Sequence, residues 1–423
     1  MNDSFAYKGF FWLPNFPQNK IAGLLKYEPQ EYIELDLIGT FGKDLNIGIR
    51  HHEIVNGILG NRLVALYNVD EKYRSYNLGG SGFSNYRVGY IFLDIHADKI
   101  SDLKFHKLTS EFDYLEEWIN KNESFKINYD QKNYEVKIAY KPPTPIIANI
   151  GRQLNCRLDF YSEGPTILIG KYQKEAHIKQ ITVISIESKR KIDFDLLLEY
   201  LEHYQRFVSI AAQEPVRIKN IYFYIKSKKI NEPHKVPVVF LSKKVFRKKK
   251  DNITAADFLF TYDRIEDLYE NLLNRWFAKK EKLDISLNSF FNTLYSPIFN
   301  VDIFLNTVKA LEAYHREFIN KDNVYQIDRY AELFMRGRKA FNPFLKIRSK
   351  AKFCRKIRDS RNDFTHNNPH KNNKKINYVF LFKITEQIKV ILICNILIDL
   401  GIDLNRIHDF IGKSDLFLYV RKK

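Results

Sequence analysis

Cysteine is scarce in this chain of 423 residues, which has three in all, at Cys156, Cys354 and Cys394. The three lie far apart and show none of the short spacings that zinc ligands adopt. This scarcity argues against a disulfide framework and against a cysteine-based zinc site. It predicts a protein of a reducing compartment, the cytoplasm.

A long apolar run is also missing. The N-terminal residues Met1–Ser4 are not a basic segment followed by an apolar core, so no signal peptide is expected. The most apolar stretch, Val390–Leu400, is too short to span a bilayer and follows Lys383, Glu386 and Lys389. We therefore interpret it as a buried helix and expect no membrane partner.

Glycine and proline are too few, at 17 and 13, for a fibrous or low-complexity chain. The hydrophobic content of 45% is sufficient for the cores of two or three domains. Acidic residues are outnumbered, with 50 Asp and Glu against 68 Lys and Arg and a net charge of +18. Such an excess favours a polyanionic partner, but the Lys and Asn usage of an AT-rich genome would produce the same total.

The first 250 residues are expected to form a β-rich α+β region of one or two subdomains. Apolar and polar residues alternate over Tyr134–Tyr140, which predicts a half-buried strand. Helical spacing of apolar residues predicts helices at Leu103–Asn120 and Asp193–Ala212. Turn residues at Gly79–Gly82 and Pro142–Pro145 separate apolar runs. Further strands are expected at Ile33–Ile38, Tyr90–Ile95, Thr166–Ile169, Ile181–Ile186, Ile221–Ile225 and Val236–Leu241.

The remainder, residues 255–423, is expected to be an all-α bundle. The basic run Lys243–Lys250 is typical of a solvated linker before it. Apolar residues then recur at helical spacing over Ile265–Leu273 and Phe304–Phe318, and the last long helix is expected at Ile376–Leu400. No strand pattern occurs after residue 255. The whole chain is therefore predicted to be α+β, a β-rich region followed by a helical bundle.

Basic residues accumulate in one part of this bundle. Between Arg336 and Lys375 there are 14 Lys or Arg and two acidic residues, Asp359 and Asp363. A local excess of this kind suits the phosphates of a nucleic acid backbone. The residues that we expect to bind RNA are Lys350, Lys352, Arg355, Arg358 and Lys371.

Within this segment Arg361 and His366 stand five residues apart, a spacing that is weak as a motif by itself. Its context is more informative, because an inward apolar stripe predicts a helix that ends near His366, before an Asn-rich polar loop. The stripe consists of Phe353, Ile357, Ser360 and Phe364. We expect both side chains to be exposed at the helix end. The alternative is a solvated arginine followed by a polar loop histidine.

The segment Arg361–His366 resembles the Arg-x4–6-His signature of HEPN ribonucleases, including the polar residue Asn362 directly after the arginine. The expected helix Phe304–Arg316 resembles the first core helix of the HEPN domain in ApeA-type proteins. Three early segments are similar to the opening of the ApeA N-terminal domain: Gly9–Pro14, Ile21–Tyr27 and Ile33–Gly39. From about residue 120 to 250 no motif contributes to the resemblance.

The resemblance implies an anti-phage abortive-infection protein whose HEPN domain cleaves RNA without a metal or other cofactor, as a homodimer or higher homo-oligomer. The N-terminal region would sense or regulate, with a phage-encoded trigger as one possible partner and tRNA as one possible substrate. His366 suits the role of general acid and base, and Arg361 that of a phosphate clamp. Asn362 would orient the phosphate or the histidine. Supporting roles are expected for Glu312, which would hold Arg361 or instead pair with Arg316, and for Asp359.

Arg361 and His366 lie about 140° apart on an ideal helix, so one straight helix does not aim both at the same phosphate. Either the helix ends before His366, or two chains combine their residues in a composite site, as the resemblance implies. Two other functions stay open: a non-catalytic nucleic-acid-binding or assembly module with the same bundle, and a toxin that acts on membrane surfaces through its basic face.

Overall fold

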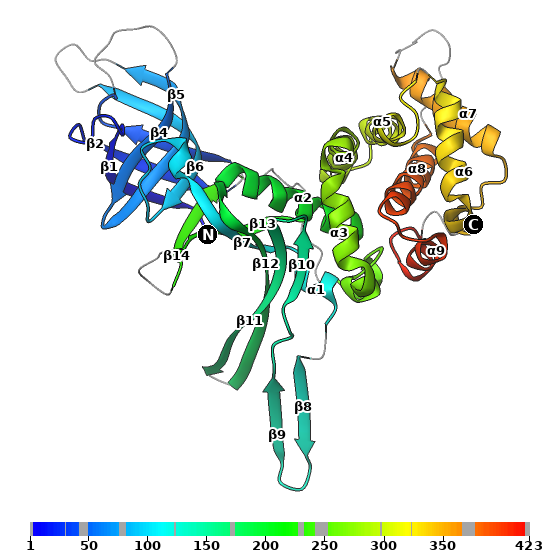
Figure 1. Cartoon of the computed structure of the whole chain (residues 1–423), viewed down its shortest axis with the longest axis horizontal. Coiled ribbons are helices and arrows are strands. Elements are labelled where there is room, and N and C mark those ends of the chain that lie inside the picture. The colour runs from blue at the N-terminus through cyan, green and yellow to red at the C-terminus, as the bar shows by residue number, and fades with distance from the viewer. Residues whose placement is uncertain are drawn as a thin grey trace. The chain divides into compact units, whose positions relative to one another are not determined.

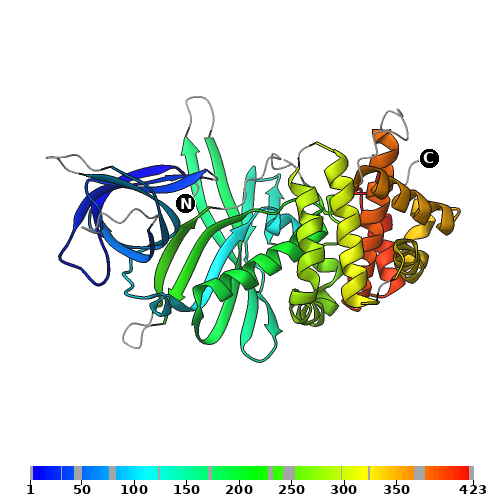
Figure 2. The same cartoon turned by 90° about the horizontal axis from the view of Figure 1, so that it is seen from above.

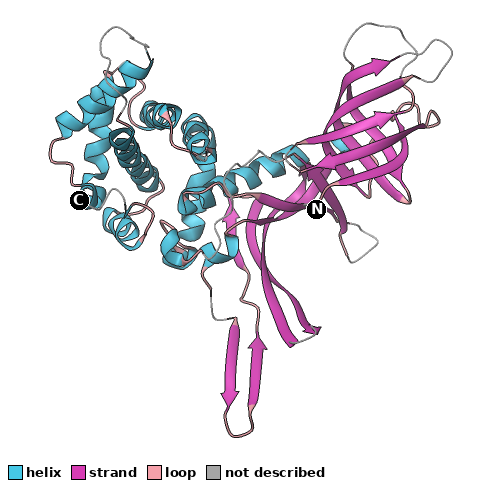
Figure 3. Cartoon of the chain, turned by 180° about the vertical axis from the view of Figure 1, so that it is seen from behind, coloured by secondary structure: helices cyan, strands magenta, loops and turns pink. Residues whose placement is uncertain are grey.

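The computed structural model describes residues 3–29, 31–41, 50–75, 82–121, 124–169, 174–226, 232–241, 253–296, 298–322, 324–365 and 377–418. The chain divides into two compact units. The first contains Met1–Asp113, Phe125–Glu202 and Arg217–Lys244. The second contains Tyr114–Ser124, His203–Val216 and Val245–Lys423. The first unit consists mainly of strands and the second of helices (Figure 3).

Six antiparallel strands at the start of the first unit close into a barrel. They follow one another in the order β6-β3-β2-β1-β4-β5, and β5 pairs back with β6 (Figures 1 and 2). The strands are β1 (Phe5–Trp12), β2 (Ile21–Glu28), β3 (Tyr32–Leu37), β4 (His51–Leu59), β5 (Arg62–Ser75) and β6 (Phe83–Leu93). Closure leaves the barrel without the unpaired edges of an open sheet.

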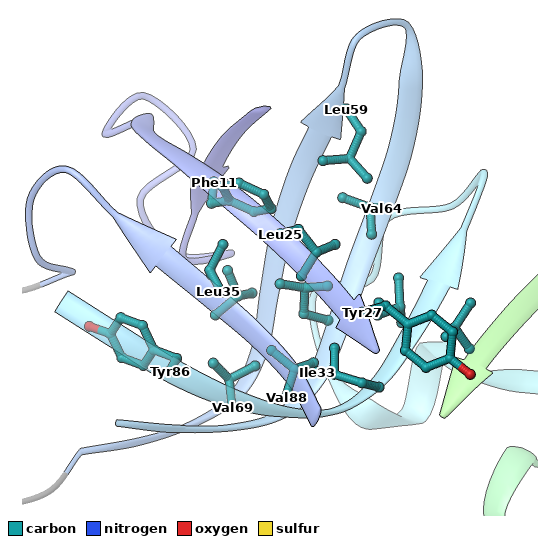
Figure 4. Packing of buried hydrophobic residues seen from close by; sticks show 14 of the residues in the cluster. Phe11, Leu25, Tyr27, Ile33, Leu35, Leu59, Val64, Val69, Tyr86 and Val88 are labelled. Atoms are coloured by element: carbon teal, nitrogen blue, oxygen red, sulfur yellow. The ribbon is translucent and has the colours of Figure 1, made fainter. Parts of the chain in front are cut away.

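Alternate residues of these strands point into the barrel and form its core (Figure 4). On β3, for example, Ile33, Leu35 and Leu37 are buried, as the period-2 pattern predicts. Phe11 fills the space beside Gly57, where a Cβ atom would lie 2.6 Å from the Phe11 ring. Glycine is therefore required at position 57 for this packing.

The sheet continues beyond the barrel, because one edge of β6 pairs first with β3 and then with β14. The order from there is β14-β13-β7-β12-β11-β10. These strands are β14 (His234–Phe240), β13 (Ile218–Ile225), β7 (Lys104–Phe112), β12 (Lys174–Asp193), β11 (Leu154–Ile169) and β10 (Ile146–Ile150). A separate two-stranded sheet is made by β8 (Phe125–Asp130) and β9 (Glu135–Tyr140).

The helix expected at Leu103–Asn120 is wrong. Lys104–Phe112 is β7, a strand with a partner on each side, and only Leu115–Ile119 is helical, as the short α1. The spacing of Phe105, Leu108 and Phe112 fits a helix, but pairing with the distant strands β12 and β13 overrides this local pattern. The second expected helix is confirmed as α2 (Phe194–Ala212).

The strand expected at Tyr134–Tyr140 is confirmed as β9, but its half-burial is wrong, since the residues from Glu135 to Ala139 are exposed. The six further strand regions are confirmed in β3, β6, β11, β12, β13 and β14. Pro142–Pro145 connects β9 to β10. The turn Gly79–Gly82 lies largely, and the linker Lys243–Lys250 entirely, outside the described residues.

All regular structure described after residue 253 is helical, which confirms the predicted bundle and the α+β fold class. Three short 3-10 turns come first, at Ala255–Asp257, Tyr262–Arg264 and Glu266–Leu268. The α-helices are α3 (Tyr269–Ala278), α4 (Lys280–Tyr295), α5 (Val301–Phe318), α6 (Gln326–Leu345), α7 (Lys350–Thr365), α8 (Tyr378–Asp399) and α9 (Leu404–Lys413). α8 is buried over Val390–Leu397, as expected. Among the described residues, no helix is long and apolar enough to cross a membrane.

Candidate active site

Helix α7 carries the charged segment and packs against α5 and α6. Phe353 and Ile357 are buried, and Ser360 and Phe364 are partly buried, which confirms the predicted inward stripe. The Phe353 ring lies 6.0 Å from that of Phe334 on α6. The Phe364 ring meets that of Phe304 on α5 edge to face, with centroids 6.1 Å apart. These contacts hold the first turn of α7 against α6 and its last turn, next to Arg361, against α5.

Arg361 is partly buried, so its expected exposure is wrong. The reason is its place on the helix: at 100° per residue it falls within about 40° of both Cys354 and Ile357, which are buried. Nη1 of Arg361 donates a hydrogen bond to Oδ1 of Asn362 at 3.2 Å. Two of the three predicted catalytic residues are therefore in direct contact.

Glu312 lies on α5 and is buried, with 8% of its surface exposed. The hydroxyl of Tyr330, on α6, donates a hydrogen bond to Oε1 of Glu312 at 2.5 Å. Among the described residues, no ion pair joins Glu312 to Arg361 or to Arg316. The hydrogen-bond partner of Glu312 on α6 is therefore Tyr330, a contact that the sequence did not suggest.

Electrostatics place Arg361 beside this pair. Burial raises the pKa of the Tyr330 phenol far above its ordinary value, and the Glu312 carboxylate raises it further. The positive charge of Arg361 lowers the same pKa, so it acts on Tyr330 from nearby. We call Glu312, Tyr330 and Arg361 the α5–α6–α7 cluster. In it a hydrogen bond joins the carboxylate of Glu312 to the phenol of Tyr330, and the guanidinium of Arg361 lies within electrostatic reach of that phenol.

The other predicted residues on α7 face solvent. Asp359 is exposed and its carboxylate pairs with Arg358, with Nη2 and Oδ1 2.5 Å apart. Lys350, Lys352 and Arg355 are exposed, and no ion pair engages them among the described residues. These three cations are therefore available to phosphates, whereas Arg358 already has an anionic partner.

Two predicted residues, His366 and Lys371, lie outside the described residues. The description of α7 reaches Thr365, whose hydroxyl donates to the carbonyl of Arg361 at 2.7 Å. The catalytic role of His366 stays a prediction.

A second set of buried polar residues, on α5 and α6, could not be recognised from the sequence either. His315 is fully buried; its Nε2 lies 2.7 Å from Oε2 of Glu332 and its Nδ1 accepts from Arg329 at 2.9 Å. Burial lowers the pKa of His315. Arg329 also donates to the carbonyls of Asn320 and Asp322, so this group holds the connection between α5 and α6. Its ring nitrogens are occupied, and we assign it a structural role.

Among the described residues, no group of three or more His, Cys, Asp or Glu side chains is arranged to bind a metal ion. The three cysteines are buried and form no disulfide. Burial raises the pKa of the Cys354 thiol, beside the α5–α6–α7 cluster, to about 11, so it stays protonated at neutral pH.

Comparison with protein families gives two matches. Residues 6–276 match the family described as ApeA N-terminal domain 1. Residues 305–406 match the family described as Apea-like HEPN, a range that runs from α5 into α9 and includes the α5–α6–α7 cluster. No curated protein and no solved structure matches the chain.

Proposed function

The chain belongs to the ApeA family and carries an Apea-like HEPN domain at its C-terminus, and on this premise we propose that it is an endoribonuclease of anti-phage defence. It would act in the cytoplasm of the infected cell and arrest growth by cutting RNA, with tRNA as a candidate substrate. The β-rich N-terminal region would regulate this activity, with a phage-encoded protein as a candidate trigger that raises it above a basal level.

The observation that carries the proposal is the position of Arg361. Its guanidinium is partly buried, contacts Asn362 and lies beside the Glu312–Tyr330 pair. A fully solvated surface arginine would be neither partly buried nor within electrostatic reach of a buried phenol. A guanidinium that is partly buried and bonded to Asn362 is restricted in orientation, which suits a clamp on a phosphate. It stands in the last turn of α7, five residues before His366.

The proposed reaction uses the 2′-OH of RNA as its own nucleophile. His366 removes the 2′-OH proton or protonates the leaving 5′-oxygen, since an imidazole exchanges protons near neutral pH. The 2′-oxygen forms a bond to phosphorus while the bond to the 5′-oxygen breaks, leaving a 2′,3′-cyclic phosphate and a 5′-OH. Arg361 stabilises the charge on the phosphate oxygens, and Asn362 keeps the guanidinium aligned.

The site is proposed to be shared between two chains. On an ideal helix Arg361 and His366 diverge by about 140°, so the arginine of one chain and the histidine of another would serve one phosphate. The exposed cations Lys350, Lys352 and Arg355 would hold the flanking phosphates. Bound RNA would also relieve the repulsion between two basic α7 segments brought together.

Purified full-length protein and total tRNA provide the test. Wild type is expected to cleave, whereas His366→Ala and Arg361→Ala should each lose activity by at least about a hundredfold while unfolding at the same urea concentration as wild type. The matched control is Arg316→Ala, an exposed arginine on α5, which should cleave normally. Cleavage by His366→Ala near the wild-type rate would disprove the assignment.

The alternatives predict different results in the same experiment. A non-catalytic RNA-binding module would bind RNA without cutting it, and His366→Ala would be indistinguishable from wild type. A membrane-surface toxin would bind anionic vesicles and leave RNA intact. In cells, comparison of total RNA from phage-infected cultures that express wild type or His366→Ala then tests whether cleavage belongs to defence.

A further inference from the structure

The hairpin of β8 and β9 exposes an apolar face over most of its length, and only Tyr140 at its base reaches β12, through a hydrogen bond to Gln180. Phe125 lies opposite Tyr140, Ile127 opposite Ile138, and Tyr129 opposite Val136, so all six side chains point to the same side of the two-stranded sheet. The exposed fractions are 52% for Ile127, 72% for Tyr129, 57% for Val136 and 49% for Ile138. We call these six residues the apolar hairpin face.

The opposite side of the hairpin is polar. There Lys126 faces Ala139, Asn128 faces Lys137, and Asp130 faces Glu135. The sheet consists of two strands, which extend away from the larger sheet of the same unit (Figures 1 and 3). A free two-stranded hairpin is marginally stable in water, and a third strand or a packed surface is what usually stabilises one. An amphipathic hairpin without that cover is typical of an interaction surface.

We propose that the apolar hairpin face binds a partner protein through an extended, acidic segment with apolar side chains at every second position. Such a segment would add to a free edge of β8 or β9 as a third strand. Its apolar side chains would then extend the face formed by Ile127 and Ile138. Main-chain hydrogen bonds would provide affinity, and the alternating side chains would provide specificity.

Charge supports an acidic partner. Asp130 accepts hydrogen bonds from the backbone of Lys132 and Asn133 in the turn, and Glu135 pairs with Lys137 at 3.0 Å. Both carboxylates of the hairpin therefore already have partners within the hairpin itself. Lys126, Lys132 and Lys141 have no ion pair among the described residues; Lys126 and Lys141 stand at the base of the hairpin and Lys132 in its turn. Acidic residues flanking an apolar stretch would complement them.

A second copy of the hairpin fits less well. The exposed part of the face is on the order of 600 Å², below the roughly 800 Å² that each partner contributes to a standard interface. Pressing two copies together would also bring the unpaired lysines near one another. A membrane fits less well because the turn carries the Asp130 carboxylate, and insertion of the hairpin tip would bury that charge.

The test uses the full-length protein and a fluorescent synthetic peptide in which Val alternates with Thr, with two Glu at each end. Fluorescence anisotropy measures its affinity. The double variant Ile127→Thr/Ile138→Thr should bind about tenfold more weakly, because two large apolar contacts are lost while strand propensity is kept. The matched control is Asn128→Thr/Ala139→Thr, two uncharged exposed positions on the opposite side, which should bind like wild type.

Two further probes complete the test. A peptide of the same composition with its Val residues contiguous, and one with Lys in place of Glu, should each bind about tenfold more weakly than the acidic alternating peptide. Equal affinity of wild type and the apolar-face variant would overturn the proposal. So would anionic vesicle binding, or self-association in sedimentation, that disappears in that variant. The assay reads binding, so its outcome does not depend on whether the proposed ribonuclease activity exists.

Discussion

The hydroxyl of Tyr330 donates a hydrogen bond of 2.5 Å to the buried carboxylate of Glu312, and this contact joins α6 to α5 within electrostatic reach of Arg361. The carboxylate is almost removed from water, so the phenol replaces hydration that Glu312 has lost on folding. The pair gives the guanidinium a fixed anionic neighbour. Through this arrangement α5, α6 and α7 all contribute to the position of one candidate catalytic side chain.

Tyr330→Phe is therefore expected to act on both stability and catalysis. Loss of the hydroxyl leaves the Glu312 carboxylate without this donor, which should lower the free energy of unfolding by about 1–3 kcal/mol. Cleavage should fall because the anionic neighbour of Arg361 is no longer fixed. Urea unfolding and RNA cleavage measure the two effects. Tyr325→Phe, at a tyrosine with an exposed side chain, is the control and should change neither. Full activity of Tyr330→Phe would show that the pair does not position Arg361.

Cleavage is expected to continue in EDTA and to leave 2′,3′-cyclic phosphate ends. The proposed nucleophile is the 2′-OH of the substrate, and the proposed acid and base is an imidazole, so no step requires a metal. Mass spectrometry of the products, with and without chelator, makes the measurement. Products with 3′-OH and 5′-phosphate ends, or complete inhibition by chelation, would point to a metal-dependent nuclease instead.

Mixing two inactive chains should restore activity if the site is composite. Arg361→Ala and His366→Ala chains would form heterodimers in which one of the two sites keeps both residues. The expected recovery is about a quarter of the wild-type activity, since half of the randomly formed dimers are mixed and each holds one intact site. Sedimentation of the wild type should show at least a dimer. A monomer at working concentration, or no recovery on mixing, would contradict the shared site.

The three exposed cations of α7 should determine how RNA binding depends on salt. Replacing Lys350, Lys352 and Arg355 together by Gln removes three phosphate contacts, so the slope of log affinity against log salt should fall by roughly 2. Arg358→Gln is the comparison, and its effect should be smaller because Asp359 already engages that side chain. Filter binding at several salt concentrations makes the measurement. Unchanged slopes for the triple variant would exclude α7 as the phosphate-binding surface.

Acid should destabilise the helical unit through a buried histidine. His203 stacks on Trp276 with ring centroids 4.6 Å apart, and burial lowers its pKa to about 3. A depressed histidine pKa means that the unfolded chain binds the proton first, so stability is fully present above pH 6.5 and is lost as pH falls toward 3. His315, whose pKa is also lowered, acts in the same direction.

Between pH 7.5 and pH 5 the His203 contribution should fall by about 2 kcal/mol. Urea unfolding at the two pH values measures this change, and His203→Gln should reduce the difference between them. Tyr325→Phe, at an exposed tyrosine, serves as the control and should leave the difference as it is in wild type. If His203→Gln keeps the full pH dependence, other groups are responsible for it.

The sequence by itself determined the local elements and the charge distribution. Apolar residues at helical spacing predicted α2 and α5, because burying one face is enough to decide a long amphipathic helix, and the apolar stretch Val390–Leu400 predicted the buried part of α8. The basic excess of α7 and the inward stripe of Phe353 and Ile357 were also visible, because each depends on neighbours within a few turns. The resemblance carried by Arg361–His366 and by the N-terminal segments predicted the family, which the two family matches confirm.

Only the tertiary structure decided which residues meet across the chain. β7 looks helical by its spacing and becomes a strand because β12 and β13, distant in sequence, pair with its two edges. The closure of β5 on β6 and the exposure of the β8–β9 hairpin have no local signal either. Arg361 is partly buried, and Glu312 accepts its hydrogen bond from a tyrosine 18 residues further on, because three helices converge there. Contacts between separate elements depend on how those elements pack, and a periodic pattern describes one element at a time.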